Sequence, residues 1–232
     1  MSQPQALLFD VFGTVVDWRS SVAREAAAIL SAEIDGEAFA DAWRARYQPA
    51  MEEVRSGRRP WTVLDELHYE NLQVVLQDFG IEAAPDDTLA ELNHAWHRLD
   101  PWPDAVAGLQ RLKQRYILAP HSNGNIALLV NMAKRAGLPW DVILGAEVVR
   151  AYKPLPESYQ RAASALGRAP AQCMMVAAHN GDLLAAQAQG LQTAFVPRPN
   201  EHGAQQKTDL TPTGDWTIVA ADFADLAVQL GV

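Results

Sequence analysis

Apolar residues cluster in short runs along much of the chain, and several of these runs end at polar side chains. The run 6–9 leads into Asp10, the run 117–120 into His-Ser-Asn-Gly, and the run 173–178 into His-Asn-Gly-Asp. Short apolar runs bounded by turn residues are typical of buried strands. We therefore predict strands at residues 6–9, 117–120, 173–178, 191–196 and 216–219.

Between these runs the apolar positions change to helical spacing. Strands that alternate with helices along a chain indicate a parallel sheet covered by helices on both faces, an α/β fold. In such sheets ligands bind beyond the carboxyl ends of the strands, where the polar segments of this chain also lie. The predicted helices of this part are residues 125–136, 156–166, 183–189 and 222–230.

The stretch from about Ser20 to Arg98 has a different pattern, because no run in it predicts a strand. Its apolar residues recur at helical spacing, which predicts amphipathic helices at 22–31, 37–54, 62–79 and 87–97. We infer a helical domain inserted after the first strand, with residues 100–103 as the return linker. The predicted domains are a core of residues 1–17 and 100–232 and a helical cap of residues 18–99.

The composition is that of a globular protein and argues against several kinds of partner. The chain has 232 residues, a formal net charge of −9 and a single cysteine, Cys173. The acidic balance argues against nucleic acid, and no apolar run is long enough to cross a membrane. One cysteine forms neither an intrachain disulfide nor a cysteine metal cluster, and the N-terminus lacks a secretory signal, so we expect a cytoplasmic protein.

Asp10 is the candidate with the clearest chemistry. It follows the first predicted strand and precedes the turn residues Gly13 and Thr14. A carboxylate held at a strand end can act as a nucleophile and form an ester intermediate. An aspartate that only closes a turn would look the same in isolation, so the assignment depends on the other polar segments.

The chain resembles the haloacid dehalogenase superfamily, and within it the L-2-haloacid dehalogenase (type II) family. Four ordered segments carry the resemblance, and together they are specific: Asp10 to Thr14, Ser122-Asn123-Gly124, Tyr152-Lys153-Pro154, and the acidic segment ending at Asp182. The resemblance implies a Rossmann-like parallel sheet core with an inserted helical cap domain, as the patterns also predict. It further implies a hydrolase without cofactor or metal, a small haloacid substrate and, since family members are often dimers, a homodimer.

The residue two positions after Asp10 separates two chemistries within the superfamily. Phosphatases of the superfamily have a second aspartate there, which protonates the leaving group, whereas this chain has Phe12. A halide leaves without protonation, and an apolar neighbour desolvates the attacking carboxylate. The resemblance therefore implies hydrolysis of small (S)-2-haloalkanoic acids to (R)-2-hydroxy acids and halide. Asp10 would attack the α-carbon with inversion, and water would then hydrolyse the ester at the aspartate carbonyl.

The resemblance also assigns roles around Asp10. Lys153 would keep the nucleophile ionised, Thr14 would hydrogen-bond it, and Asp182 would support hydrolysis of the ester. Tyr159 matches a family tyrosine near the lysine and the nucleophile. The alternatives are a solvated lysine, ordinary turn chemistry for the threonine, a metal ligand at Asp182 and helix packing for the tyrosine.

A second group would bind the substrate. Arg44, in the predicted cap, would hold the departing halide, because a guanidinium stays charged and suits a diffuse anion; a solvent-facing helical arginine is the alternative. Asn123 would donate a second hydrogen bond to the halide. Ser122 would hold the substrate carboxylate, in addition to capping the next helix. The set also includes the backbone N–H groups of Val11 and Phe12 for the carboxylate, and the rings of Phe12 and Trp61 as pocket walls. Simple packing in the cap is the alternative for Trp61.

The last segment departs from the family. Well-known members have Ser-Ser-Asn-x-Trp-Asp where this chain has Ala-Ala-His-Asn-Gly-Asp, residues 177–182. Two hydroxyls are absent, so the role of positioning water would pass to His179 or Asn180. Neutral histidine accepts a proton from water, and a structural histidine held by the backbone is the alternative.

Two other functions fit the same pattern. A magnesium-dependent phosphatase of the superfamily would use Asp10 as a metal ligand, but Phe12 and Arg44 argue against it. A non-catalytic binding protein is compatible with any fold, but Asp10, Lys153 and Ser122 together argue against it. The sequence predicts neither the preferred halogen nor the strictness of stereoselectivity.

Overall fold

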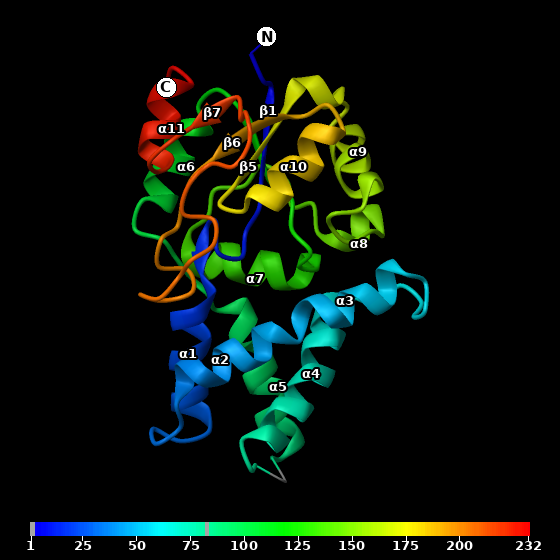
Figure 1. Cartoon of the computed structure of the whole chain (residues 1–232), viewed down its shortest axis with the longest axis vertical. Helices are drawn as coiled ribbons and strands as arrows, with labels where there is room; N and C mark the ends of the chain where they lie inside the picture. The colour runs from blue at the N-terminus through cyan, green and yellow to red at the C-terminus, as the bar shows by residue number, and fades with distance from the viewer. Residues whose placement is uncertain (1–2, 82–83) are drawn as a thin grey trace.

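The computed structural model of the chain describes residues 3–81 and 84–232 (Figure 1). The remaining four positions, at the start of the predicted core and within the predicted cap, lie outside this description. A five-stranded parallel sheet has the order β4-β1-β5-β6-β7, which confirms the predicted α/β class. Its strands are β1 (Ala6–Phe9), β4 (Ile117–Pro120), β5 (Cys173–Ala177), β6 (Gln192–Phe195) and β7 (Ile218–Val219).

Strand β1 lies between β4 and β5, and all of its residues are buried. Side chains alternate along a strand, so Leu7 and Phe9 join one hydrophobic cluster while Ala6 and Leu8 join the other. The chain continues from β1 to β4 on one side and later to β5 on the other. The carboxyl ends of these three strands therefore surround a switch point, where open α/β sheets bind ligands.

Helices cover both faces of the sheet (Figure 1). On the face of Phe9 pack α6 (Ala105–Leu112), α7 (Ile126–Ala136) and α11 (Phe223–Gln229). On the opposite face pack α9 (Pro156–Ala165) and α10 (Asn180–Ala188). The short helices α8 (Ala146–Val149) and η2 (Pro170–Gln172) precede α9 and β5.

Helix α6 is absent from the sequence prediction, although its apolar residues have helical spacing. The helix starts two residues after Pro103, and the prolines at the return linker favour an irregular segment there. The short α8 also escaped prediction, because four residues carry no periodic pattern.

The inserted helices lie beyond the carboxyl edge of the sheet, in the lower half of Figure 1. The predicted helix 37–54 is two helices that meet at Arg46. Pro49 explains the break, because it has no N–H to donate to Ala45 and its ring would clash with that carbonyl. The segment comprises α1 (Trp18–Ile29), α2 (Gly36–Ala45), α3 (Tyr47–Arg55), α4 (Leu64–Asp78), α5 (Asp86–Asn93) and the 3-10 helix η1 (His94–His97).

A short antiparallel ribbon joins the inserted helices to the sheet-bearing part. Strand β2 (Val16–Asp17) pairs with β3 (Asp100–Pro101), so part of the predicted linker is paired backbone. Asp17 also caps α1, because its carboxylate accepts from the Ser20 N–H. The segments that lead into and out of the inserted helices are thus paired side by side. The division into two domains at this ribbon stays a prediction.

Across the two described ranges, the helices are all too short or too polar to span a bilayer.

Candidate active site

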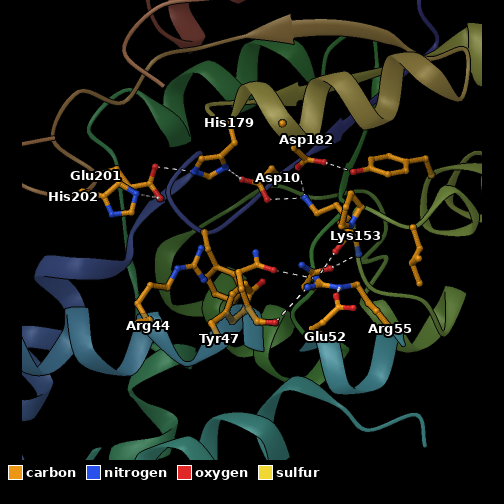
Figure 2. Close-up of a pocket in the computed structure, with 18 residues that line it drawn as sticks. Asp10, Arg44, Tyr47, Glu52, Arg55, Lys153, His179, Asp182, Glu201 and His202 are labelled. Carbon is orange, nitrogen blue, oxygen red and sulfur yellow. Dashed lines mark hydrogen bonds and ion pairs between the residues drawn. The ribbon is translucent and has the colours of Figure 1, made fainter. Parts of the chain in front are cut away.

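A cavity of about 830 Å³ lies beyond the carboxyl ends of β1, β4 and β5. Residues from the sheet side line it together with residues of α2 and α3, so both parts of the chain contribute. Figure 2 shows Asp10, Lys153 and Asp182 on the sheet side, with Arg44 and Tyr47 projecting from the opposite helices.

Asp10 lies at the base of this cavity with 7% of its surface exposed. Its Oδ1 accepts a hydrogen bond from Lys153 Nζ at 2.8 Å, and its Oδ2 accepts one from Thr14 Oγ1 at 2.7 Å. Thr14 Oγ1 itself accepts from the Ala178 N–H at 2.9 Å, so the threonine proton is directed to Asp10. The carboxylate is therefore held at both oxygens.

Lys153 is fixed at its backbone as well as at its ammonium group. Its N–H donates to Asn123 Oδ1 at 2.8 Å, and its carbonyl accepts from Arg55 Nη1 at 3.0 Å. Its Nζ donates to both Asp10 and Asp182. The protein thus supplies its own cation between these two carboxylates.

The charges of this cluster depend on one another. Burial would raise the pKa of Asp10, but Lys153 and His179 outweigh it and hold that pKa well below its ordinary value. Burial would lower the pKa of Lys153, but the two carboxylates raise it. Burial raises the pKa of Asp182, with Asp10 adding to the effect and Lys153 opposing it. Asp10 is therefore the carboxyl group that stays ionised most firmly.

Tyr159 completes the surroundings of Asp182. Its hydroxyl donates to Asp182 Oδ1 at 2.6 Å, and burial together with the Asp182 charge raises the pKa of the phenol. Tyr159 is thus a neutral donor. Its ring is buried in the hydrophobic cluster that also contains Ala6 and Leu8. Hydrogen bonding and helix packing, which the sequence left as alternatives, both occur at this residue.

His179 lies between two carboxylates. Its Nδ1 is 3.1 Å from Asp10 Oδ2, and its Nε2 is 2.8 Å from Glu201 Oε2. Burial would lower the pKa of His179, but Glu201 and Asp10 raise it well above its ordinary value. With Asp10 ionised, both contacts therefore favour the imidazolium form of His179, which donates to Asp10 and to Glu201.

Glu201 is the main residue that sequence reasoning missed. It lies in the loop after β6 with 1% of its surface exposed, and Trp18 Nε1 donates to its Oε1 at 3.0 Å. No motif surrounds it in the sequence. One indirect signal is the glycine at position 13. A side chain there would collide with Glu201, because a Cβ would lie 2.0 Å from Glu201 Oε1.

Arg44 enters the cavity from α2. Its guanidinium carbon lies 4.1 Å from the ring centre of Tyr47, 5.3 Å from that of Trp18 and 5.8 Å from that of Phe12. Its Nη1 is buried and has no hydrogen-bond partner among the described residues. A buried charged donor without a partner indicates a place for an anion.

The other residues predicted to bind substrate are close to Asp10. Asn123 lines the cavity, and because its oxygen accepts from Lys153, its NH₂ group is left for a ligand. Within residues 3–81 and 84–232, the backbone N–H groups of Val11 and Phe12 have no acceptor. Ser122 is buried and follows His121, whose N–H donates to the Phe9 carbonyl at the end of β1. The Ser122 Oγ accepts from the Gly124 N–H, which is the local turn bond.

Two predicted site residues lie elsewhere. Trp61 packs on Tyr152, with ring centres 4.9 Å apart, and does not line the cavity; Tyr47 is the second aromatic wall beside Phe12. Of the two roles left open for Trp61, a pocket wall and simple packing, its ring contact corresponds to packing. Asn180 does not line the cavity either, because its side chain is used by the loop that precedes β7. It donates to Asp209 and to the Thr211 carbonyl, and accepts from the Thr213 N–H and from Trp216 Nε1.

His121, the residue before Ser122, is a buried neutral histidine. Burial, with the nearby Lys153 charge, lowers its pKa to about 3, and its Nε2 lies 3.3 Å from Ser158 Oγ. It contacts the ring of Tyr159 rather than the cavity. In the described part of the chain, no group of three or more His, Cys, Asp or Glu side chains is arranged to hold a metal ion.

Several known proteins of similar sequence or structure are named as 2-haloacid dehalogenases. The family model of haloacid dehalogenase-like hydrolases matches residues 4–190. A solved structure of a defluorinating L-2-haloacid dehalogenase has a TM-score of 0.96 at 53% identity, covering 99% of this chain and 96% of the other. Another L-2-haloacid dehalogenase structure has a TM-score of 0.94 at 46% identity and covers 98% of each chain. An (S)-2-haloacid dehalogenase of Burkholderia cepacia is 31% identical over 84% of this chain and 83% of its own length.

Proposed function

This chain belongs to the haloacid dehalogenase-like hydrolases, and within them to the (S)-2-haloacid dehalogenases. We propose that Asp10 is the nucleophile in the hydrolysis of small (S)-2-haloalkanoic acids. The products are the (R)-2-hydroxy acid and halide. The proposal depends on the Asp10 carboxylate, which is ionised, held at both oxygens and open to the cavity. The Arg44 guanidinium faces the same cavity and offers a binding place for an anion.

In the first half-reaction an Asp10 oxygen attacks the substrate α-carbon and the carbon–halogen bond breaks with inversion. The substrate carboxylate accepts from the N–H groups of Val11 and Phe12 and from the nearby Ser122 hydroxyl. The leaving halide is received by Arg44 and the NH₂ group of Asn123. Donors that are already in place where negative charge develops lower the barrier without reorganisation.

In the second half-reaction water attacks the Asp10 carbonyl carbon and releases the hydroxy acid. Lys153, held by Asp182, stabilises the oxyanion that forms on the former carboxylate. Tyr159 fixes Asp182 in turn. The hydroxyl oxygen of the product therefore comes from Asp10, and the enzyme regains an oxygen from water.

The inserted helices complete the site in this proposal. Arg44 and Tyr47 reach the cavity from α2 and α3, so residues 18–99 act as a cap on the core of residues 1–17 and 100–232. A cytoplasmic location and a homodimer stay proposals that rest on composition and on the family resemblance.

Phosphatase chemistry is not favoured by the residues present. It needs an acid at the second position after the nucleophile, and Phe12 has no proton to give to an alkoxide. The Phe12 ring instead lies against Tyr47 and Trp96, at 6.3 and 5.7 Å between ring centres, and forms an apolar wall.

Halide release from racemic 2-chloropropionate, with and without a chelator, tests the proposal. We expect the (S) enantiomer alone to be consumed, (R)-lactate to form, and the rate to be insensitive to chelation. Absence of halide, or activity lost on chelation and restored by magnesium, contradicts the proposal. Because a relative at 53% identity is named as defluorinating, the panel includes fluoro-, chloro- and bromoacetate.

A further inference from the structure

Three residues from distant parts of the sequence form a continuous hydrogen-bonded line at the cavity. Glu201, His179 and Asp10 are joined by contacts of 2.8 and 3.1 Å (Figure 2). His179 and Glu201 both line the cavity, but only His179 touches the nucleophile. Glu201 is buried and also held by Trp18, so its carboxylate is aimed at the imidazole.

We propose that Glu201 is a positioning residue for His179, and that esterification of Asp10 converts His179 into the base that activates the hydrolytic water. This inference rests on the proposed dehalogenation, because it concerns the second half-reaction at the same site. It assigns to the loop after β6 a role that none of the recognised sequence segments supplies.

The charge of Asp10 decides the state of His179. In the resting enzyme the imidazolium contacts two carboxylates, and both raise its pKa. Formation of the ester removes the negative charge of Asp10, so one of these contacts becomes neutral and the pKa of His179 falls. The histidine side chain is 24% exposed, which gives its proton a path to solvent.

Other charged groups face the same pair from several elements. Arg44 on α2 and His202 beside Glu201 both lower the pKa of Glu201, after His179 itself, and overcome the opposite effect of burial. Arg44 and His202 therefore still favour the ionised form of Glu201 after His179 has lost its proton. The side chains of Lys153 and Asp182 are linked to the His179 ring through Asp10.

Protons are conserved over ester formation and ester hydrolysis. When the ester forms, halide leaves and His179 releases one proton to solvent from Nδ1. His179 keeps its Nε2–H, which still donates to Glu201. Water then attacks the Asp10 carbonyl carbon and gives a proton to Nδ1. As the carbon–oxygen bond to the product breaks, the alkoxide takes the remaining proton from the new Asp10 carboxyl group. The resting carboxylate and imidazolium are restored, and one proton and one halide are released per turnover.

Rapid-mixing halide release with the Glu201→Gln variant tests the inference. Glutamine keeps the shape and an oxygen acceptor for Trp18, but it removes the charge that supports His179. We expect a burst of about one halide per active site at close to the wild-type rate, followed by turnover slowed roughly 10- to 100-fold. Mass spectrometry then finds the ester on Asp10. Glu157→Gln, which removes the same charge from the exposed start of α9, is the matched control and keeps wild-type turnover.

The pH dependence of ester hydrolysis separates this role from a merely structural one. In the wild type the hydrolysis rate rises as His179 loses its proton. Removing the Glu201 charge lowers the pKa of His179, so the inflection moves to lower pH in Glu201→Gln, and Glu201→Asp restores part of both rate and inflection. His179→Gln, which accumulates the ester with no such inflection, serves if Glu201→Gln is unstable.

Each other outcome counts against the inference. Unchanged turnover in Glu201→Gln, or equal loss of burst and turnover in a variant with a normal melting curve, overturns it while wild-type activity leaves the proposed function intact. An inflection unmoved by the variant also overturns it. If the wild type releases no halide at all, the proposed function fails first.

Discussion

Asp10 and Lys153 are each charged in a buried site because the other is present. Burial by itself would favour the neutral form of both, and their contact at 2.8 Å reverses this preference. The attacking carboxylate is thus kept ionised without a metal ion in contact with it in the proposed mechanism. The same residue must then be covalently modified and regenerated in every cycle.

A single turnover in heavy-oxygen water tests this covalent cycle. We expect the label in the Asp10 carboxylate and an unlabelled first product, because water attacks the carbonyl carbon of the ester. Mass spectrometry of the enzyme and of the hydroxy acid gives both readings. Asp10→Asn is the control and should lose roughly a thousandfold or more of the halide release. A labelled first product would mean that water attacks the α-carbon directly.

A substitution at Arg44 tests the proposed halide site. Its planar guanidinium lies over the rings of Tyr47 and Trp18 and leaves one buried nitrogen without a partner. Lysine keeps the charge but loses the planar donor group and the ring contacts. We expect Arg44→Lys to lower the rate of the halide burst roughly 10- to 100-fold, while ester hydrolysis in the same variant slows less. An unchanged burst rate would remove Arg44 from the halide site.

At the scale of elements, the turn between β1 and β2 has to leave space for a distant loop. Gly13 has φ +85 and the Glu201 carboxylate occupies the place of a Cβ, with the nearest oxygen at 2.0 Å. The glycine is therefore required twice, by backbone conformation and by contact. This turn and the loop after β6 have to be packed together for His179 to be held.

Gly13→Ala separates these two requirements when it is compared with Gly80→Ala. Gly80 has φ +73 with nothing within 4 Å of a Cβ, so alanine there costs only the left-handed backbone, about 1–2 kcal/mol. Gly13→Ala should cost more in urea unfolding, because it also displaces Glu201. It should slow ester hydrolysis, while Gly80→Ala leaves turnover unchanged. Equal stability losses and equal activities would contradict the contact.

The elements also show how far the sequence could be interpreted. The buried runs of β1 and β4 have the predicted bounds, because a short apolar run between turn residues is a local signal. The break between α2 and α3 depends on one proline, and the pairing of β2 with β3 depends on residues about eighty positions apart in the chain, beyond any window of periodicity.

The site also contains residues that the sequence predicts and one that it does not. Asp10, Thr14, Lys153 and Asp182 follow strands or lie in recognisable segments, and the structure brings them together. Glu201 lies 183 positions from Trp18, its hydrogen-bond donor, in a loop without periodicity. No local pattern could have placed it beside His179.

At the scale of the whole molecule, the titration of His179 links the site to stability. Its folded pKa is raised well above the ordinary 6.5, so the stabilisation that it provides is fully present below that pH and is lost as pH rises through the folded pKa. We expect the free energy of unfolding to fall as the pH rises above about 6.5, measured by urea unfolding. His179→Gln should flatten this slope. A wild-type slope that the variant retains would assign the dependence to another group.

The β2–β3 ribbon has a consequence for how such a molecule can change. It sets Asp17 opposite Asp100, so the segment between them departs from and returns to neighbouring points of the chain. A segment with adjoining ends can be exchanged for another without altering the path of the sheet. Transplanting residues 18–99 from a relative would therefore exchange the cavity walls of α2 and α3, together with Arg44 and the Trp18 donor to Glu201, while Asp10, Lys153 and His179 keep their places in the chain.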